Sequence, residues 1–352
     1  MRANNIFFPV ASIIKIFILL SILTFSSKSE ENESKFFSND KGILSIMYHR
    51  FDEIKYPSTN IRMEVFRKHM DIISKKNYSY LNPKDFDKKF SERKIKKKIL
   101  ITIDDGFSSF YEKAWPYLKE EQIPFILFIS TEAIGKNGYM SWDEIKEIEK
   151  ESFAFIGNHS HSHDYLLDLS FEEFKADIIK SVEIFEDNLG YNPIFFSYPF
   201  GEFSKKQLSF IKKKFKYRFG QHSGVIDINK NPYELPRFPI NEKYGDLERF
   251  EFIIDLLPLE YKDVIPKDKY ITNNNPPKLE ITFFEDQKNL ENINCFSDEG
   301  NNWKQSKIKF QDNKLFVDFS DKFLFRRGRI NCSLNDKEGW RWFGLQFSVR
   351  LN

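Results

Sequence analysis

Short apolar runs alternate with longer amphipathic runs over residues 42–262, and this alternation most constrains what the chain can fold into. The apolar runs have the length of strands and the amphipathic runs the length of helices. The expected strands are Ile43–Tyr48, Ile99–Ile103, Phe125–Ile129, Phe153–Gly157, Phe195–Tyr198 and Lys216–Gly220. The expected helices are Arg62–Lys76, Ser108–Glu121, Trp142–Lys150, Phe171–Leu189 and Ser204–Lys214. Alternation of this kind indicates an α/β fold, a parallel sheet or barrel covered by helices.

The pattern changes after residues 271–277 (ITNNNPP), because three Asn and two Pro in succession do not fit inside a helix or a central strand. We therefore expect a linker at 263–278 and a small, sandwich-like all-β module at 279–352. Its expected strands are Leu279–Phe284, Ile308–Phe310, Leu315–Phe319 and Phe343–Val349. Its aromatic residues either stack on sugars or fill the core of the module. They are Trp303, Trp340, Trp342 and Phe343.

The N-terminus indicates export. Arg2 precedes an apolar stretch, Ile16–Phe25, that has the length of the hydrophobic region of a signal peptide. We expect a signal peptide or membrane anchor at 1–29 and a linker at 30–41, since residues 6–25 could also span a bilayer. Either way the body of the protein is expected outside the cytoplasm, as a periplasmic, cell-surface or secreted protein. Cys295 and Cys332 would pair in such an oxidising compartment, with two buried free thiols as the alternative.

The charge balance excludes one class of partner. Lys and Arg number 54 and Asp and Glu 52, a formal net charge of +2, so no concentrated basic face for nucleic acid is expected. The single basic cluster, residues 93–98 (RKIKKK), is interpreted as a solvated loop before a strand. Oligomeric state is not readable from the sequence.

Three motifs follow predicted strands: ITIDDG at 101–106, GNHSHSH at 157–163 and FFSYPFG at 195–201. In parallel β/α folds, active sites form at this edge of the sheet. His159 and His163 are four residues apart, so a turn of helical pitch would bring both imidazoles to one side, and His161 would point away. Together with Asp105 they offer three ligands for Zn²⁺ or a similar divalent ion, leaving positions for water and substrate. Asp104 would then accept a proton from the water, although a DDG sequence is also a common turn.

These motifs resemble those of the polysaccharide deacetylases of carbohydrate esterase family four, the NodB-homology fold. The resemblance covers residues 42–262 and implies a distorted (β/α) barrel with fewer than eight strands. It implies that Asp104 is the general base and that Asp105, His159 and His163 bind one divalent metal. Zn²⁺ is expected, with Co²⁺, Ni²⁺ or Fe²⁺ as alternatives. It further implies that Phe200, after the proline of SYPFG, offers its backbone N–H to the oxyanion.

Two departures from the family pattern matter. Ser197 stands where the third motif usually has an Arg that orients the base, and no histidine after that motif matches the usual general acid. His49 instead ends the first predicted strand, an arrangement similar to the permuted subgroup of PgaB- and IcaB-like poly-N-acetylglucosamine deacetylases. In this interpretation His49 is the general acid, with a structural strand-end histidine as the alternative. Arg237, in LPRFP, is our candidate to orient Asp104.

The sequence therefore predicts an exported, metal-dependent hydrolase that removes N-acetyl groups from a polysaccharide containing N-acetylglucosamine. An N-acetylated glycan is the expected partner, and membrane association through the N-terminus stays open. A non-catalytic glycan-binding protein on a degenerate deacetylase scaffold is one alternative, which the missing motif Arg favours. An O-acetyl esterase that uses the same centre is another.

Overall fold

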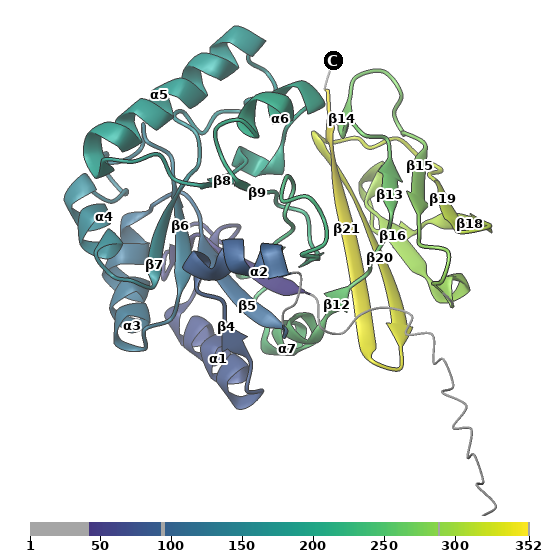
Figure 1. The fold of residues 1–352 in the computed structure, drawn as a ribbon, viewed down its shortest axis with the longest axis horizontal. Helices are drawn as coiled ribbons and strands as arrows, with labels where there is room; N and C mark the ends of the chain where they lie inside the picture. Colours follow the sequence, from purple (N-terminus) through teal and green to yellow (C-terminus); the bar gives the residue numbers. More distant parts are fainter. Residues whose placement is uncertain (1–41, 93–95, 288, 351–352) are drawn as a thin grey trace, which may run out of the picture. The chain divides into compact units, whose positions relative to one another are not determined.

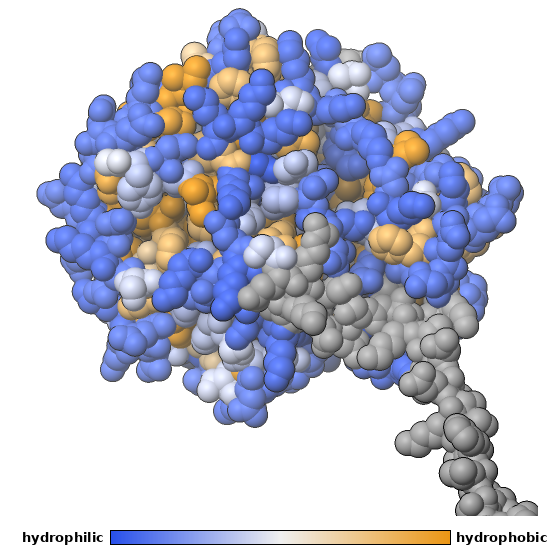
Figure 2. All heavy atoms as spheres, in the orientation of Figure 1, coloured by the Kyte–Doolittle hydropathy of each residue, from blue (hydrophilic) through white to orange (hydrophobic). Residues whose placement is uncertain are grey.

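The computed structural model of the protein describes residues 42–92, 96–287 and 289–350. The expected signal or anchor at 1–29 and the linker at 30–41 lie outside these residues. Within the described ranges, no helix is long and apolar enough to cross a membrane. On the face drawn in Figure 2, hydrophilic side chains predominate and hydrophobic ones form small, scattered groups.

The first part of the chain forms a curled sheet whose main path has the order β10-β1-β5-β6-β7-β8-β9. Neighbours from β1 to β9 are parallel, and β10 is antiparallel to β1. Two short strands join beside this path, β11 against β1 and β4 against β5. The strands are β1 Ile43–Tyr48, β4 Ser79–Tyr80, β5 Lys98–Ile103, β6 Phe125–Ile129, β7 Ala154–Asn158, β8 Phe195–Ser197, β9 Tyr217–Phe219, β10 Val225–Ile226 and β11 Phe238–Pro239. The predicted α/β class and the incomplete barrel, with seven strands in its path, are confirmed.

Helices cover the outer side of this sheet, except for the helix Phe86–Glu92, which packs on its inner face (Figure 1). Apolar residues of several helices, such as Phe66, Trp115 and Phe185, pack against the strands in one core. Phe86 and Ile211 belong to two further clusters. The helices are α1 Met63–Lys75, α2 Phe86–Glu92, α3 Trp115–Glu120, α4 Trp142–Glu149, α5 Phe171–Leu189, α6 Lys205–Ile211 and α7 Leu247–Asp255. Ser141, Ser170 and Ser204 close capping boxes at the starts of α4, α5 and α6, which fixes where these helices begin.

The helix predicted at 108–121 is divided. Residues Phe110–Ala114 form a π-helical turn, in which Trp115 N–H donates to the carbonyl of Phe110, and α3 follows it. Pro116 explains the change, since it lacks the N–H that would continue the regular α-helical ladder. Helix α7 was not predicted. Its nine residues run directly into the apolar residues 256–259, so the hydrophobic pattern shows no boundary at which a helix would end.

The C-terminal part is a β-sandwich. One sheet has the order β12-β21-β20-β16-β17 with β14 beside β21, and the other has the order β13-β15-β19-β18. Apolar residues of both sheets, such as Ile281 and Val317 from one and Ile330 and Phe347 from the other, form a single core. The strands are β12 Leu257–Pro258, β13 Asp263–Ile265, β14 Tyr270–Ile271, β15 Leu279–Thr282, β16 Asn294–Ser297, β17 Lys304–Gln305, β18 Lys307–Gln311, β19 Lys314–Asp318, β20 Arg327–Asp336 and β21 Gly339–Val349.

The residues expected to form a linker, 263–278, take part in this sandwich. Strand β13 pairs antiparallel with β15, and β14 pairs parallel with β21. Strand β12 precedes both and also pairs with β21. The run of Asn and Pro marks a turn between two strands of the sandwich, not a linker between domains. The strands before it were not predicted, because strands of two or three residues are too short to show a periodic pattern.

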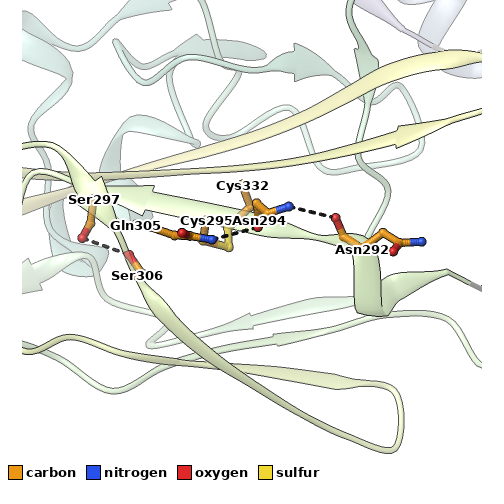
Figure 3. The surroundings of a disulfide bond; sticks show 7 residues. All are labelled: Asn292, Asn294, Cys295, Ser297, Gln305, Ser306 and Cys332. Carbon is orange, nitrogen blue, oxygen red and sulfur yellow. Dashed lines mark hydrogen bonds between the residues drawn. A yellow bond between two sulfur atoms is a disulfide. The ribbon is translucent and has the colours of Figure 1, made fainter.

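Cys295 and Cys332 form a disulfide, as predicted (Figure 3). They lie directly opposite each other in the antiparallel register of β16 and β20, and both are fully buried. Of the four aromatic residues singled out above, Trp303 and Trp340 are 49% and 43% exposed. Phe343 belongs to the sandwich core.

Candidate active site

Four segments with polar side chains leave the same edge of the curled sheet. Strands β1, β5, β7 and β8 belong to its parallel part, so their carboxyl ends point the same way. His49 follows β1, Asp104 and Asp105 follow β5, and His159 follows β7. The turn that contains Phe200 follows β8.

The DDG segment turns sharply as it leaves β5. Asp104 N–H donates to the carbonyl of Tyr48 at 2.9 Å, which extends the pairing of β1 with β5 by one residue. Asp105 and Gly106 then have positive φ angles of 78° and 74°. This left-handed turn brings both carboxylates to one site, although neighbouring side chains of a strand point to opposite faces. A Cβ at residue 106 would meet Ile129 Cγ2 at 3.0 Å, so glycine is needed for space as well as for its φ.

Asp105, His159 and His163 form a cluster that fits a metal ion. Their ligand atoms lie within 4.8 Å of one another, with Asp105 Oδ1 at 3.4 Å from His159 Nε2 and 3.2 Å from His163 Nε2. Asp105 Oδ1 and His159 Nε2 are buried without a hydrogen-bond partner. Two imidazole nitrogens and a carboxylate oxygen are a donor set that suits Zn²⁺ and similar ions.

The two histidines of the cluster are held in place by hydrogen bonds: His159 through its ring nitrogen Nδ1 and His163 through its backbone N–H. His159 Nδ1 lies 2.7 Å from the carbonyl of Ser197, so it carries the proton and leaves Nε2 with a free lone pair. His163 has a φ of 57°, and its N–H donates to Ser160 Oγ at 3.1 Å. His161 turns away, as predicted for it, and contacts Thr131 Oγ1 through Nδ1 at 2.9 Å.

Electrostatics keep the two carboxylates ionised. Burial raises the pKa of Asp105, but its contacts with His159 and His163 lower it more, so that this pKa lies well below its usual value. Burial also raises the pKa of Asp104, and the charge of Arg237 together with its hydrogen bonds brings this pKa below its usual value. Burial lowers the pKa of His163, but the hydrogen bond with Asp105 and the charge of Asp105 raise it more.

Arg237 lies against Asp104. Its Nη1 donates to Asp104 Oδ1 at 2.7 Å and its Nη2 donates to Asp104 Oδ2 at 2.8 Å, a two-bond fork between fully buried side chains. Nη2 also donates to Ser197 Oγ at 2.8 Å, and Nε donates to the carbonyl of Gly220. Ser197 is small enough to admit the guanidinium at the place where the family pattern has an arginine of its own. Arg237 therefore occupies the position that we expected for the residue that orients Asp104.

His49 shares the electrostatic environment of this site. Its Nδ1 is buried without a hydrogen-bond partner. Burial lowers the pKa of His49, while the charges of Asp105 and Asp104 act in the opposite direction. His49 therefore lies within the electrostatic influence of both carboxylates.

Phe200 occupies a strained turn beside His163. Its φ of 58° lies in the left-handed region, and its ring centroid is 4.8 Å from that of His163. Its other neighbours were not predicted. Tyr165 stacks on its ring, with centroids 4.4 Å apart, and Gln346 from β21 donates to its carbonyl at 2.9 Å. No sequence signal links Gln346 to this turn, since 146 residues separate them.

The comparisons with known proteins agree with this geometry. Residues 91–219 match the model of the family "Polysaccharide deacetylase". A protein of Staphylococcus aureus named poly-beta-1,6-N-acetyl-D-glucosamine N-deacetylase is 22% identical over 276 residues, which cover 69% of this chain and 93% of that relative.

Solved structures show the same fold. IcaB from Ammonifex degensii has a TM-score of 0.55 at 22% identity and covers 61% of this chain and 97% of its own. The deacetylase PplD of Streptococcus pyogenes, solved in complex with acetate, has a TM-score of 0.54 at 20% identity and covers 58% and 95%. The fold of the first part of the chain is therefore that of these deacetylases, and the C-terminal sandwich adds to it.

Proposed function

Because the chain carries a polysaccharide deacetylase domain, we propose that it is a metal-dependent hydrolase that removes N-acetyl groups from a polysaccharide containing N-acetylglucosamine. The observation that carries this proposal is the cluster of Asp105, His159 and His163, with Asp104 held beside it by Arg237. The name of the Staphylococcus aureus relative supports the substrate class.

Each residue has a role in the hydrolysis of an amide. Asp105, His159 and His163 would hold one divalent ion, with Zn²⁺ as the expected metal, which would lower the pKa of a water molecule and polarise the acetamide carbonyl. Asp104 takes a proton from that water as oxygen adds to the carbonyl carbon. The N–H of Phe200 stabilises the oxyanion that develops.

His49 then donates a proton to the nitrogen as the C–N bond breaks. The products are acetate and the free amine of the sugar. Export to the outside of the cytoplasm, where such a polysaccharide would be met, is part of the proposal and rests on the apolar segment before residue 30.

Asp104→Asn tests the proposal. The change keeps the shape of the side chain but removes the basic oxygen, so acetate release from N-acetylglucosamine oligomers should fall by about a thousandfold or more. Metal content, measured by elemental analysis, should stay that of the wild type, since Asp104 is not a ligand. Asp143→Asn on the exposed side of α4 is the matched control and should keep full activity.

Three results would contradict the proposal. Full activity in Asp104→Asn would exclude this residue as the base. A wild-type protein that binds metal but releases no acetate, from N-acetylated or O-acetylated oligosaccharides, would point to a glycan-binding protein. Release from O-acetylated substrates alone would identify an esterase. Arg237 beside Asp104 speaks against a degenerate scaffold, because it supplies the guanidinium that the third motif lacks.

A further inference from the structure

The turn at Pro199–Gly201 needs an external support. Phe200 has φ 58° and ψ 5°, a left-handed conformation that costs a residue other than glycine about 1 kcal/mol. Gly201, at φ 69°, follows it, and a Cβ there would lie 2.7 Å from the backbone nitrogen of Gln221. Two successive left-handed residues persist only where the surroundings fix them.

Gln346 of the sandwich supplies such a support. It lies on β21 and is 4% exposed. Its Nε2 donates to the carbonyl of Phe200 at 2.9 Å and to the carbonyl of Gly201 at 3.2 Å. One buried amide group therefore satisfies two successive carbonyls of the turn, and rotation of either peptide plane would break one of these bonds.

The orientation of the Gln346 amide is itself fixed. Its Oε1 accepts a hydrogen bond from Arg329 Nε at 3.4 Å, so Nε2 faces the turn. Arg329 is in turn held by Asp298, which accepts from its backbone N–H at 2.6 Å and lies 3.6 Å from its guanidinium. A polar chain thus runs from Asp298 on the sandwich to the turn of the deacetylase domain.

A second contact anchors the residue that follows the turn. Glu202 is 1% exposed and accepts from Arg326 Nε at 2.8 Å. Arg326 lies over the ring of Tyr165, at 4.0 Å from its centroid, and Tyr165 stacks on Phe200. The turn is therefore in contact with the sandwich through its carbonyls, through its ring and through Glu202.

We propose that Gln346 is a positioning residue for the reaction, through which the C-terminal sandwich holds the Phe200 turn in the conformation that stabilises the oxyanion. This inference rests on the proposed function, in which the N–H of Phe200 faces the developing charge. Gln346 touches no reacting atom; it holds the two peptide planes that directly follow the plane of that N–H, and so restrains the left-handed backbone of Phe200 and Gly201. The active site is then built from both parts of the chain.

Gln346→Met tests this role, because methionine has a similar volume but no N–H. We expect kcat for acetate release to fall by about tenfold, as for a small misplacement of a catalytic group, with KM and metal content unchanged. Hydrogen exchange, followed by mass spectrometry, should be faster in a peptide that contains residues 198–203. Gln346→Glu keeps the shape and replaces the donor by a carboxylate oxygen, so it should lower kcat at least as much.

The matched control is Ser223→Ala. Its hydroxyl also makes two hydrogen bonds to the sandwich, with Asn331 and Trp342, but none with the turn. It should lower the melting temperature as much as Gln346→Met does and leave kcat and the exchange of residues 198–203 unchanged.

The outcomes separate this inference from the proposed function. Acetate release by the wild type with an unchanged kcat in both Gln346 variants would overturn the inference alone. An equal loss of kcat in Ser223→Ala would also overturn it, since the sandwich would then act only through stability. If the wild type releases no acetate, the proposed function fails, and unchanged exchange in Gln346→Met would overturn the role of Gln346 as well.

Discussion

At the scale of single residues, the site divides into groups that local sequence predicts and groups that it does not. Asp105, His159 and His163 lie in two short motifs at strand ends, and the structure brings them together at the edge where such motifs converge. Arg237 is 133 residues from Asp104, and no spacing rule connects the two. The sequence therefore offers Arg237 only as a candidate to orient Asp104, because the third motif has Ser197 in place of its usual arginine.

Arg237→Lys should impair turnover without affecting metal binding. Lysine keeps the positive charge but cannot make the two-bond fork to Asp104, so the carboxylate loses its fixed orientation. We expect kcat to fall by about tenfold to a hundredfold, measured as acetate release, with metal content equal to that of the wild type.

Arg218→Lys is the control for this change. Arg218 is another buried arginine of the same sheet, on β9, and it lies over the ring of Tyr233 instead of a carboxylate of the site. The substitution should lower stability and keep kcat. An unchanged kcat in Arg237→Lys would remove Arg237 from the catalytic machinery.

At the scale of elements, the sequence predicts those with a clear period and a clear end. Strands β1 and β6 and helix α5 have the predicted bounds. Strands of two residues, such as β10 and β11, carry no period and form because tertiary contacts with β1 select them. Strand β20 is not among the expected strands, although its residues alternate between buried and partly exposed; two of its four buried positions are Gly328 and Cys332, so its apolar signal is weak.

Strand β7 offers a test of how the sheet positions His159, the residue that follows it. Gly157 faces the ring of Phe128 on β6, and a Cβ at this position would overlap with that ring. Gly157→Ala should therefore lower the free energy of unfolding by about 1–3 kcal/mol and weaken metal binding, since His159 follows two residues later. Thermal unfolding and a metal titration check the two effects.

Gly190→Ala is the control, because it adds backbone strain without steric overlap of the new Cβ. This glycine ends α5 with φ 80°, and no heavy atom within 4 Å would meet its Cβ. It should cost about 1 kcal/mol through its conformation alone and leave metal affinity unchanged. Equal metal affinity in wild type and Gly157→Ala would show that β7 tolerates the overlap without moving His159.

At the scale of the whole molecule, buried polar groups connect distant elements of the deacetylase domain. His69 on α1 is fully buried and stacks on Phe250 of α7, with ring centroids 3.8 Å apart. Its Nε2 donates to the carbonyl of Gly245 at 2.8 Å, and its Nδ1 accepts from the hydroxyl of Tyr48 on β1 at 3.0 Å. This pattern requires the neutral imidazole, because a protonated Nδ1 could not accept.

The stability of the domain should therefore fall in acid. Burial lowers the pKa of His69 from 6.5 to about 4 in the folded protein, against smaller opposing effects of Gly245 and Asp246. The unfolded chain binds this proton more tightly than the folded protein does. The contribution of neutral His69 to the free energy of unfolding is therefore fully present above pH 6.5 and is lost as the pH falls towards 4. Relative to His69→Gln, the wild type should lose at most about 3 kcal/mol over this window.

Denaturant unfolding of both proteins between pH 7 and pH 4 measures this loss. Carboxylates and other histidines titrate in both proteins, so only the difference between the two curves reports on His69. Parallel curves would mean that His69 keeps its ordinary pKa in the folded state.

Strand β21 links the sandwich to the rest of the chain, and its place in the sequence has a consequence for biosynthesis. It pairs with β12 and β14, which directly follow the deacetylase domain, and it contributes Gln346 to the Phe200 turn. All of these partners are synthesised before it. Asp105, His159 and His163 can come together early, but the Phe200 turn receives the support of Gln346 only when residues 339–349 emerge, so we expect full activity only after the whole chain has been synthesised.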